Sequence, residues 1–401
     1  MKVLAFVSGV GRGHAARCRP ILEALGARGH DCVAAVLGRR AGSLLAPACP
    51  VLVPPDGFRR RVAPPEDVEL AYTCVYDFEM SFSFYQRDML DSTRAVVAFA
   101  DEALEAVRPD VVLIDHIPPA AALARSRGLP IVQLTHGPLF PGHGPWVYWL
   151  SERPPELRYP PVLPALNRAL AGSGVPEIEN VDELLEGDLT IVPTPPELGT
   201  APGALHVDVP ALLDDTPVDL SPRSGRPLVA LLLGSTPQLL EPAVRATLAA
   251  GADAIVVEAD GARLPPDPGV RALRVVDAAA LLRQVDAAVH HGGSGSIVTC
   301  LQAGVPSAAV PTQGEQDFNA HRLAELGLGL VVPVSDESLE PVALRDGVVA
   351  PAHRGEHGLA ERLAAALPRL ADLRPAALEA QRELERLPRA EAAVEAIELL
   401  V

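Results

Sequence analysis

Two apolar runs of the same kind begin the two halves of the chain, and each leads directly into a glycine turn. They are "KVLAFVSG" at residues 2–9 and "LVALLLGS" at residues 228–235. Uninterrupted apolar runs of this length are typical of strands buried on both faces, as in parallel sheets that helices cover on each side. The repeated start therefore predicts two parallel α/β units.

The segments that follow each start alternate between strand and helix patterns. The first half continues with "RCRPILEALGARGH", "DCVAAVLG", "PDVVLID", "PPAAALARSRG" and "PIVQLTHG", and the second with "DAIVVEAD", "RALRVVD" and "DAAVHHGG". Residues 202–227 are rich in Pro, Asp, Ser and Gly, which indicates a linker. A chain of 401 residues also exceeds what one hydrophobic core usually organises.

The expected fold class is therefore α/β, with two Rossmann-like doubly wound domains facing across a cleft. We assign residues 1–215 to the first domain and 216–401 to the second. Ligands of such sheets bind beyond the carboxyl ends of the strands, so we expect the site in the cleft between the domains. The last segment, residues 370–401, has a helical pattern interrupted by Pro375 and Pro388.

Charge and cysteine usage narrow the partners and the compartment. A net charge of −17 argues against nucleic acid or an anionic membrane surface as a partner. No apolar run approaches the roughly 20 residues that span a bilayer, and the apolar start is too short for a signal peptide. The five cysteines form no CxxC pair, which favours a reduced, cytoplasmic protein. We expect a monomer or homodimer without stable membrane association.

The aromatic residues are unevenly distributed. All Phe, Tyr and Trp residues except Phe6 and Phe318 lie between residues 58 and 159. Two interpretations remain open: core packing of inserted helices, or an apolar pocket for a bulky substrate. The loop "PGHGPWVYWL" at 141–150 favours the pocket, because loops carry specificity. The candidate acceptor-binding residues are Phe82, Phe84, His136, Trp146 and Trp149.

A glycine-rich loop with two histidines follows one predicted strand of the second half, in "DAAVHHGGSGSIVTC" at 286–300. Its glycines allow close approach of a ligand, and the helix that starts there offers free N–H groups and a favourable dipole to a phosphate. His291 and His290 can add donors. Such a loop is also common in ordinary tight turns. Further on, the adjacent Glu315 and Gln316 pair a carboxylate with an amide, which suits neighbouring sugar hydroxyls, although such residues also occur on solvated loops.

Residues 290–329, "HHGGSGSIVTCLQAGVPSAAVPTQGEQDFNAHRLAELGLG", resemble the donor-binding signature of nucleotide-sugar-dependent GT-B glycosyltransferases. They are most similar to bacterial enzymes that decorate natural products. The resemblance implies a GT-B fold and transfer of a sugar from a TDP- or UDP-sugar to a small-molecule hydroxyl. It implies that Glu315 and Gln316 bind the donor sugar. It also implies diphosphate binding by Gly234, Ser235, Thr236, His291, Gly293, Ser294, Gly295 and Ser296.

The same resemblance implies that His14 in "GRGHAAR" is the general base and Asp115 its partner. The chemistry agrees, because an attacking alcohol must lose a proton and an imidazole titrates near neutral pH. Asp115 closes the predicted strand "VVLID" and could orient the imidazole. Other interpretations remain open: His14 as a phosphate contact and Asp115 as a helix cap. His116 and His136 are rival histidines.

The chain departs from the plant version of the signature at the nucleoside. The position of the ribose-binding glutamate holds Thr299, and the stacking tryptophan corresponds to the region of Val275 and Val276. Both replacements resemble bacterial relatives that use thymidine diphosphate deoxysugars. The sequence has no metal motif, because Asp214 and Asp215 lie in the acidic linker, and the family needs no metal or other cofactor.

Three functions are compatible with these residues. The first is an inverting glycosyltransferase acting on a small-molecule acceptor. The second is a nucleotide-sugar hydrolase or epimerase of the same fold, because "GHAARC" is similar to the "GHxxRC" run of certain sugar-nucleotide hydrolases. The third is a non-catalytic donor-binding helper protein. The aromatic-rich segment favours an organic acceptor over water, and the presence of both His14 and Asp115 disfavours a helper.

Overall fold

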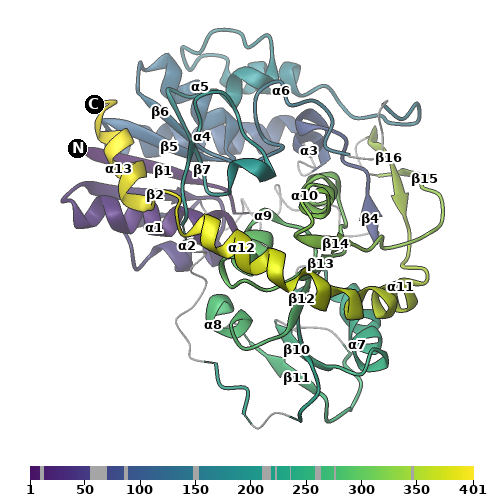
Figure 1. The fold of residues 1–401 in the computed structure, drawn as a ribbon. Coiled ribbons are helices and arrows are strands. Elements are labelled where there is room, and N and C mark those ends of the chain that lie inside the picture. Colours follow the sequence, from purple (N-terminus) through teal and green to yellow (C-terminus); the bar gives the residue numbers. More distant parts are fainter. Residues whose placement is uncertain are drawn as a thin grey trace.

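The protein has two parallel sheets with helices on both faces, and a small third sheet joins the two halves (Figure 1). The computed structural model describes residues 1–9, 13–54, 70–84, 89–147, 153–209, 218–221, 224–234, 236–257, 263–274, 277–344 and 347–401. The expected doubly wound α/β class is confirmed.

The first sheet has the strand order β3-β2-β1-β5-β6-β7-β8, and all of its strand pairs are parallel. Its strands are β1 (Lys2–Val7), β2 (Asp31–Val36), β3 (Val51–Leu52), β5 (Val111–Asp115), β6 (Ile131–Leu134), β7 (Leu189–Val192) and β8 (Leu205–His206). The last strand, β8, lies inside the segment predicted to be a linker, so the first sheet reaches further along the chain than expected.

Helices cover both faces of this sheet because side chains alternate along β1. Val3, Ala5 and Val7 pack against α1 (Gly13–Ala27) and α2 (Arg39–Leu45). Leu4 and Phe6 pack on the opposite face. The helices of that second face are α4 (Met89–Val107), α5 (Pro118–Ser126) and α6 (Val162–Leu170). Each strand is therefore buried on both sides, which explains its continuous apolar sequence.

The second sheet repeats this plan with the order β11-β10-β9-β12-β13-β14. Its strands are β9 (Leu228–Leu232), β10 (Asp253–Val257), β11 (Val270–Leu273), β12 (Ala287–His290), β13 (Ser307–Ala309) and β14 (Gly329–Val331). The helices of this half are α7 (Leu240–Ala249), α8 (Ala278–Leu282), α9 (Ser294–Gln302) and α10 (Gly314–Glu325).

Two features cross between the halves. The strand β4 (Tyr72–Thr73), ahead of α3 (Phe78–Phe84), pairs with β16 (Val349–His353), which pairs with β15 (Glu340–Ala343). At this junction a Cβ on Gly314 would lie 1.9 Å from the carbonyl oxygen of Val75, so only glycine fits there.

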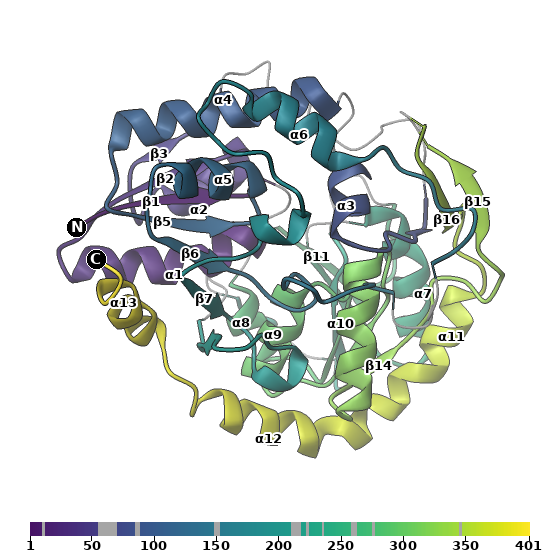
Figure 2. The ribbon, with the colours of Figure 1, turned by 90° about the horizontal axis from the view of Figure 1, so that it is seen from above.

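The C-terminal helices return to the first sheet. They are α11 (Leu359–Ala366), α12 (Arg374–Leu384) and α13 (Ala390–Glu398). Figure 2 shows α13 beside α1, where Val394 and Ile397 join the first core and Glu398 pairs with His30. Pro375 lies in the first turn of α12, a position that tolerates proline, while Pro388 lies in the break before α13. The domain boundary near residue 215 falls in 210–217, outside the described residues, and stays a prediction.

Candidate active site

His14 and Asp115 meet at the point where the strand order of the first sheet reverses. His14 lies in the first turn of α1, directly after β1, and Asp115 is the last residue of β5. The two strands are neighbours, with Val7 opposite Asp115. The Nδ1 atom of His14 lies 2.7 Å from Oδ1 of Asp115. Ligand sites of doubly wound sheets form at this switch point, so the position of the pair fits a reactive site.

Arg17 completes this cluster, although the sequence-based prediction of the site did not include it. Its Nε donates to Oδ2 of Asp115 at 2.7 Å and its Nη2 to Oδ1 at 2.5 Å. The same Nη2 lies 2.8 Å from Nδ1 of His14. The string "GHAARC" already contained the signal, because residues three apart share one face of a helix. The chemistry alone had directed attention only to the histidine.

The charges around Asp115 keep it ionised although it is fully buried. Burial by itself raises the pKa of a carboxyl group, but the nearby Arg17 and His14 lower the pKa of Asp115 far below its usual value. Cys18 also donates to Oδ2 from 3.3 Å. A buried carboxylate with this many donors is stable as an anion.

His116, directly after Asp115, connects the cluster to an aromatic wall. Its ring stacks on His14 with centroids 5.7 Å apart, and Phe78 meets it edge-on at 5.7 Å. Trp146 lies beyond Phe78 at 6.5 Å. His116 has a positive φ of 57°, a strained conformation for a residue with a side chain. Burial and the nearby His14 lower the pKa of His116 to about 3, so it is neutral near pH 7.

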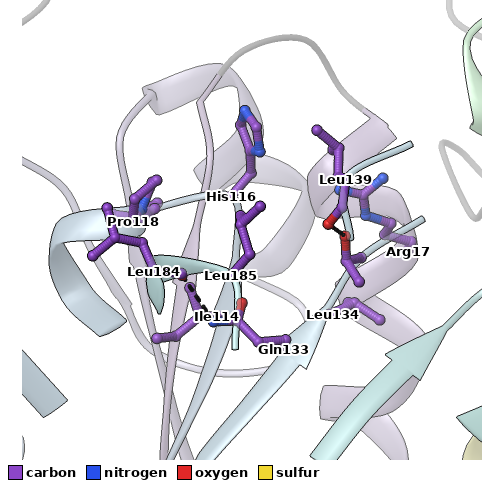
Figure 3. Close-up of a pocket in the computed structure, with 11 residues that line it drawn as sticks. Arg17, Ile114, His116, Pro118, Gln133, Leu134, Leu139, Leu184 and Leu185 are labelled. Carbon is purple, nitrogen blue, oxygen red and sulfur yellow. Dashed lines mark hydrogen bonds between the residues drawn. The ribbon is translucent and has the colours of Figure 1, made fainter. Parts of the chain in front are cut away.

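A small cavity lies behind the cluster (Figure 3). Its volume is about 10 Å³, room for roughly one water molecule. Figure 3 shows Arg17 on one side of it, and Gln133, Leu134 and Leu139 are among the other residues around it. The void is too small for a substrate, so it belongs to the support of Arg17.

The second histidine site lies at the matching switch point of the other sheet, where β12 runs beside β9. His290 ends β12 opposite Leu232. Its Nδ1 accepts from the Gly292 N–H at 3.0 Å, and its Nε2 lies 3.0 Å from the hydroxyl of Ser307. His290 is therefore fully used in holding the glycine loop. Burial, with a smaller effect of His291, lowers its pKa to about 3.

His291 and the start of α9 form the open part of this loop. The Nδ1 atom of His291 is buried without a hydrogen-bond partner in the described part of the chain. Burial lowers the pKa of His291, and the carbonyl of Leu232 opposes that shift. A Cβ on Gly293 would lie 2.6 Å from Nε2 of His291, so this glycine lets the ring fold over the loop. Ser294, Gly295 and Ser296 form the first turn of α9.

The residues of the facing strand are only partly described. Gly234 and Thr236 follow β9, and the Thr236 hydroxyl donates to the carbonyl of Leu233 at 3.2 Å. Ser235 lies outside the described residues, as do Val275 and Val276. The hydroxyl of Thr299 donates to the Gly295 carbonyl inside α9. The predicted diphosphate and nucleoside roles of these residues stay predictions.

Glu315 and Gln316 lie in the first turn of α10, between the two histidine sites. Glu315 accepts from Asn319 at 2.5 Å and lies 3.8 Å from Nδ1 of His136 across the cleft. Burial raises the pKa of Glu315 to about 7, against the lowering effects of Asn319, Arg17 and the backbone of Ser294. The side-chain oxygen of Gln316 accepts from the N–H and hydroxyl of Thr312, which leaves its amide nitrogen for a ligand.

The candidate acceptor residues fall into three groups. Trp146 is buried in the cluster with Phe78, so its ring contributes to the wall rather than to an open surface. His136 is buried, and burial, followed by the charge of Arg17, lowers its pKa well below its usual value. Phe82 and Phe84 belong to α3, but their side chains, like all of Trp149, lie outside the described residues.

A larger open pocket of about 710 Å³ lies elsewhere, between the loop at 153–156 and the segment 331–339. Its walls include none of the predicted site residues. Size alone therefore does not locate the site, and the clustering of charged and histidine side chains at the two switch points is the stronger indicator.

The chain matches two known families. Residues 1–137 match "Glycosyl transferase family 1", and residues 247–371 match "Erythromycin biosynthesis protein CIII-like, C-terminal domain". The curated relatives include 3-alpha-mycarosylerythronolide B desosaminyl transferase of Saccharopolyspora erythraea, 31% identical over 62% of this chain and 63% of the relative. Tylactone mycaminosyltransferase of Streptomyces fradiae is 30% identical over 60% and 57%. The matched stretch spans less than two thirds of these relatives.

Solved structures match over the full length. The glycosyltransferase VinC in complex with dTDP has a TM-score of 0.68 at 22% identity, covering 100% of this chain and 99% of that one. The spinosyn rhamnosyltransferase SpnG in complex with thymidine diphosphate has a TM-score of 0.65 at 19% identity, covering 99% and 100%. The chain thus has the GT-B fold, and it belongs with the bacterial natural-product glycosyltransferases that share its two family domains.

Proposed function

We propose that this protein is an inverting glycosyltransferase that moves a sugar from a nucleoside diphosphate donor to a hydroxyl of a small-molecule acceptor. The observation that carries the proposal is the contact between His14 and the buried Asp115 at the switch point of the first sheet. The relationship to natural-product glycosyltransferases supports the same reaction.

In this proposal His14 is the general base. Its Nδ1 faces Asp115, so Nε2 is the nitrogen left to take the acceptor proton. As the proton moves to Nε2, the acceptor oxygen attacks the anomeric carbon and the bond to the diphosphate breaks, with its electron pair leaving on the phosphate. Asp115 stabilises the imidazolium that forms. One displacement by one nucleophile inverts the anomeric configuration.

The donor would bind at the second switch point. His291 and the first N–H groups of α9 would hold the diphosphate together with Gly234, Ser235 and Thr236, while Glu315 and Gln316 bind the sugar. Protein donors would then stabilise the leaving group without a metal. The complexes of VinC and SpnG with thymidine diphosphate support a TDP-sugar as the donor.

The acceptor would bind over the wall formed by His116 and Phe78, next to His14. Phe82, Phe84 and Trp149 remain proposed acceptor residues. All five cysteines are free, which supports the proposed cytoplasmic location. None of the helices in the described ranges is long and apolar enough to cross a membrane.

The direct test is incubation with TDP- and UDP-sugars, first alone and then with a panel of hydroxylated natural products, in the presence and absence of a chelator. We expect a glycoside with inverted configuration by NMR, formed only with an acceptor and at the same rate with chelator. Release of free sugar without any acceptor would instead identify a hydrolase. Tight diphosphate binding without turnover on any acceptor would identify a helper protein.

A further inference from the structure

We propose that Arg17 is a positioning residue that sets the pH at which His14 becomes an active base. This inference rests on the proposed function of His14. Arg17 does not touch the substrate in this proposal. It acts through Asp115 and through the ring of His14, with which it shares the first two turns of α1.

The first step is the fork that Arg17 makes on Asp115. Its Nε and Nη2 bind the two different carboxylate oxygens at 2.7 and 2.5 Å, and the arginine side chain is only 10% exposed. This arrangement fixes the carboxylate plane and cancels its charge with a matched cation. Asp115 therefore presents an aligned acceptor to His14 with little net negative charge behind it.

The second step is the competition for Nδ1 of His14. Asp115 lies 2.7 Å from that nitrogen and needs a proton there, because a carboxylate only accepts. Arg17 lies 2.8 Å from the same nitrogen and can only donate, so it opposes a proton at that position. When His14 becomes an imidazolium, Asp115 attracts the new charge and the guanidinium repels it. Arg17 thus limits how readily the base becomes trapped in its protonated form.

The other groups around His14 do not replace this effect. Cys18 is on the same helix, and burial raises the pKa of its thiol well above the usual value, so it stays neutral. His116 and His136 are neutral near pH 7, because burial lowers the pKa of both. Glu315 acts on Arg17 from α10. Among these neighbours, Arg17 is the cation that faces the ring.

The test compares pH–rate profiles of the full-length wild type, Arg17→Gln and Arg17→Lys. Removing the guanidinium leaves an uncompensated carboxylate beside His14, which favours imidazolium. We therefore expect the acid limb of kcat to move to higher pH by about one to two units in Arg17→Gln. Activity near pH 7 falls about tenfold or more and recovers above pH 9, while the KM for the donor stays within about twofold.

Arg17→Lys keeps a cation beside Asp115 and serves where the glutamine variant fails to fold. Its ammonium can hold one oxygen but not form the fork, so we expect a smaller shift in the same direction. Arg19→Gln is the matched control, because Arg19 is on the same helix but pairs with Glu23, and its profile should coincide with that of the wild type. Uniformly lower kcat in both Arg17 variants, without a shift of the limb, would overturn the proposal.

An NMR titration separates this inference from the proposed function. The ring signals of His14, assigned by their loss in His14→Ala, can be followed with pH in the wild type and in both Arg17 variants. We expect the His14 ring to retain its proton to higher pH in the variants, whether or not any acceptor is turned over. An unchanged His14 titration would refute the role of Arg17 even if the protein transfers sugar.

Discussion

The two switch points carry histidines in equivalent places, yet their electrostatics are opposite. At the first, His14 touches a full ion pair formed by Arg17 and Asp115. At the second, His290 and His291 are neutral, because burial lowers the pKa of both, and the open groups there are N–H donors at the start of α9. The same fold position thus supplies a charged, oriented base in one half and an uncharged anion cradle in the other.

This difference teaches how the repeated architecture divides labour. A base must accept a proton, so it needs a carboxylate partner to stabilise the product cation. A phosphate site needs donors and a helix dipole, and a nearby carboxylate would oppose its ligand. The first site is expected to control turnover and the second to control donor affinity. Four experiments test this separation.

The largest effect is expected for His14→Ala. Loss of the general base should lower kcat by about 10²–10⁴, while TDP affinity by calorimetry stays nearly unchanged. Asp115→Asn should lower kcat by a similar or smaller factor, because an amide still accepts from Nδ1 but carries no charge. Full activity of His14→Ala would eliminate His14 as the base, and His136 would be the next histidine to substitute.

The complementary change at the second site is His291→Ala. It should weaken TDP binding about 10- to 100-fold, because a hydrogen bond to a charged phosphate contributes about 1.5–3 kcal/mol. At saturating donor, kcat should change much less. His357→Ala, at a half-exposed histidine far from the loop, is the control. If calorimetry gives the same affinity for His291→Ala and the wild type, the cradle must be assigned to other groups.

A smaller effect on stability is expected for Ser307→Ala. The hydroxyl of Ser307 holds Nε2 of the buried His290, so its removal should lower the free energy of unfolding by about 1 kcal/mol. Chemical denaturation measures this value, with Ser43→Ala on the exposed side of α2 as the control. TDP affinity should fall slightly as the loop loosens. A stability equal to that of the wild type would show that His290 does not depend on this contact.

The smallest signal is expected from Glu315, which lies between the two sites. Its pKa of about 7 means that about half of the molecules carry a proton there at pH 7. A bound diphosphate near Ser294 would raise this pKa, so TDP binding should take up a fraction of one proton between about pH 7 and 8. Calorimetry in buffers of different ionisation enthalpy measures the uptake.

The variant Glu315→Gln should abolish this proton uptake, whereas Glu325→Gln, at the other end of α10, should leave it unchanged. Glu315→Ala and Gln316→Ala should also harm use of the sugar nucleotide while sparing affinity for bare TDP, because their partners would be hexose hydroxyls. Equal losses for both ligands would show that this turn is structural.

The same carboxyl group predicts a change of stability with pH. Its pKa is raised on folding, so the folded protein binds more protons than the unfolded chain between roughly pH 4.5 and 7. The contribution of Glu315 to stability therefore falls as pH rises through that window. Glu315→Gln should gain up to about 3 kcal/mol relative to the wild type when denaturation is compared at pH 8 and pH 5.

The sequence by itself determined the repeated parallel strands, because strands buried on both faces require continuous apolar runs. It also determined which chemical groups stand at strand ends, such as His14, Asp115 and the glycine loop. Strand ends in parallel sheets gather at one edge, so linear order was enough to place these residues in one region.

Only the tertiary structure decided how these groups share protons and charge. The fork of Arg17 on Asp115 joins residues 98 positions apart, and the approach of His136 to Glu315 depends on the packing of the two halves. It also showed that His290 is consumed by Gly292 and Ser307, whereas the sequence left both histidines open as donors. Hydrogen-bond partners and burial depend on distances of a few tenths of an ångström between segments far apart in the chain, and no local pattern encodes those distances.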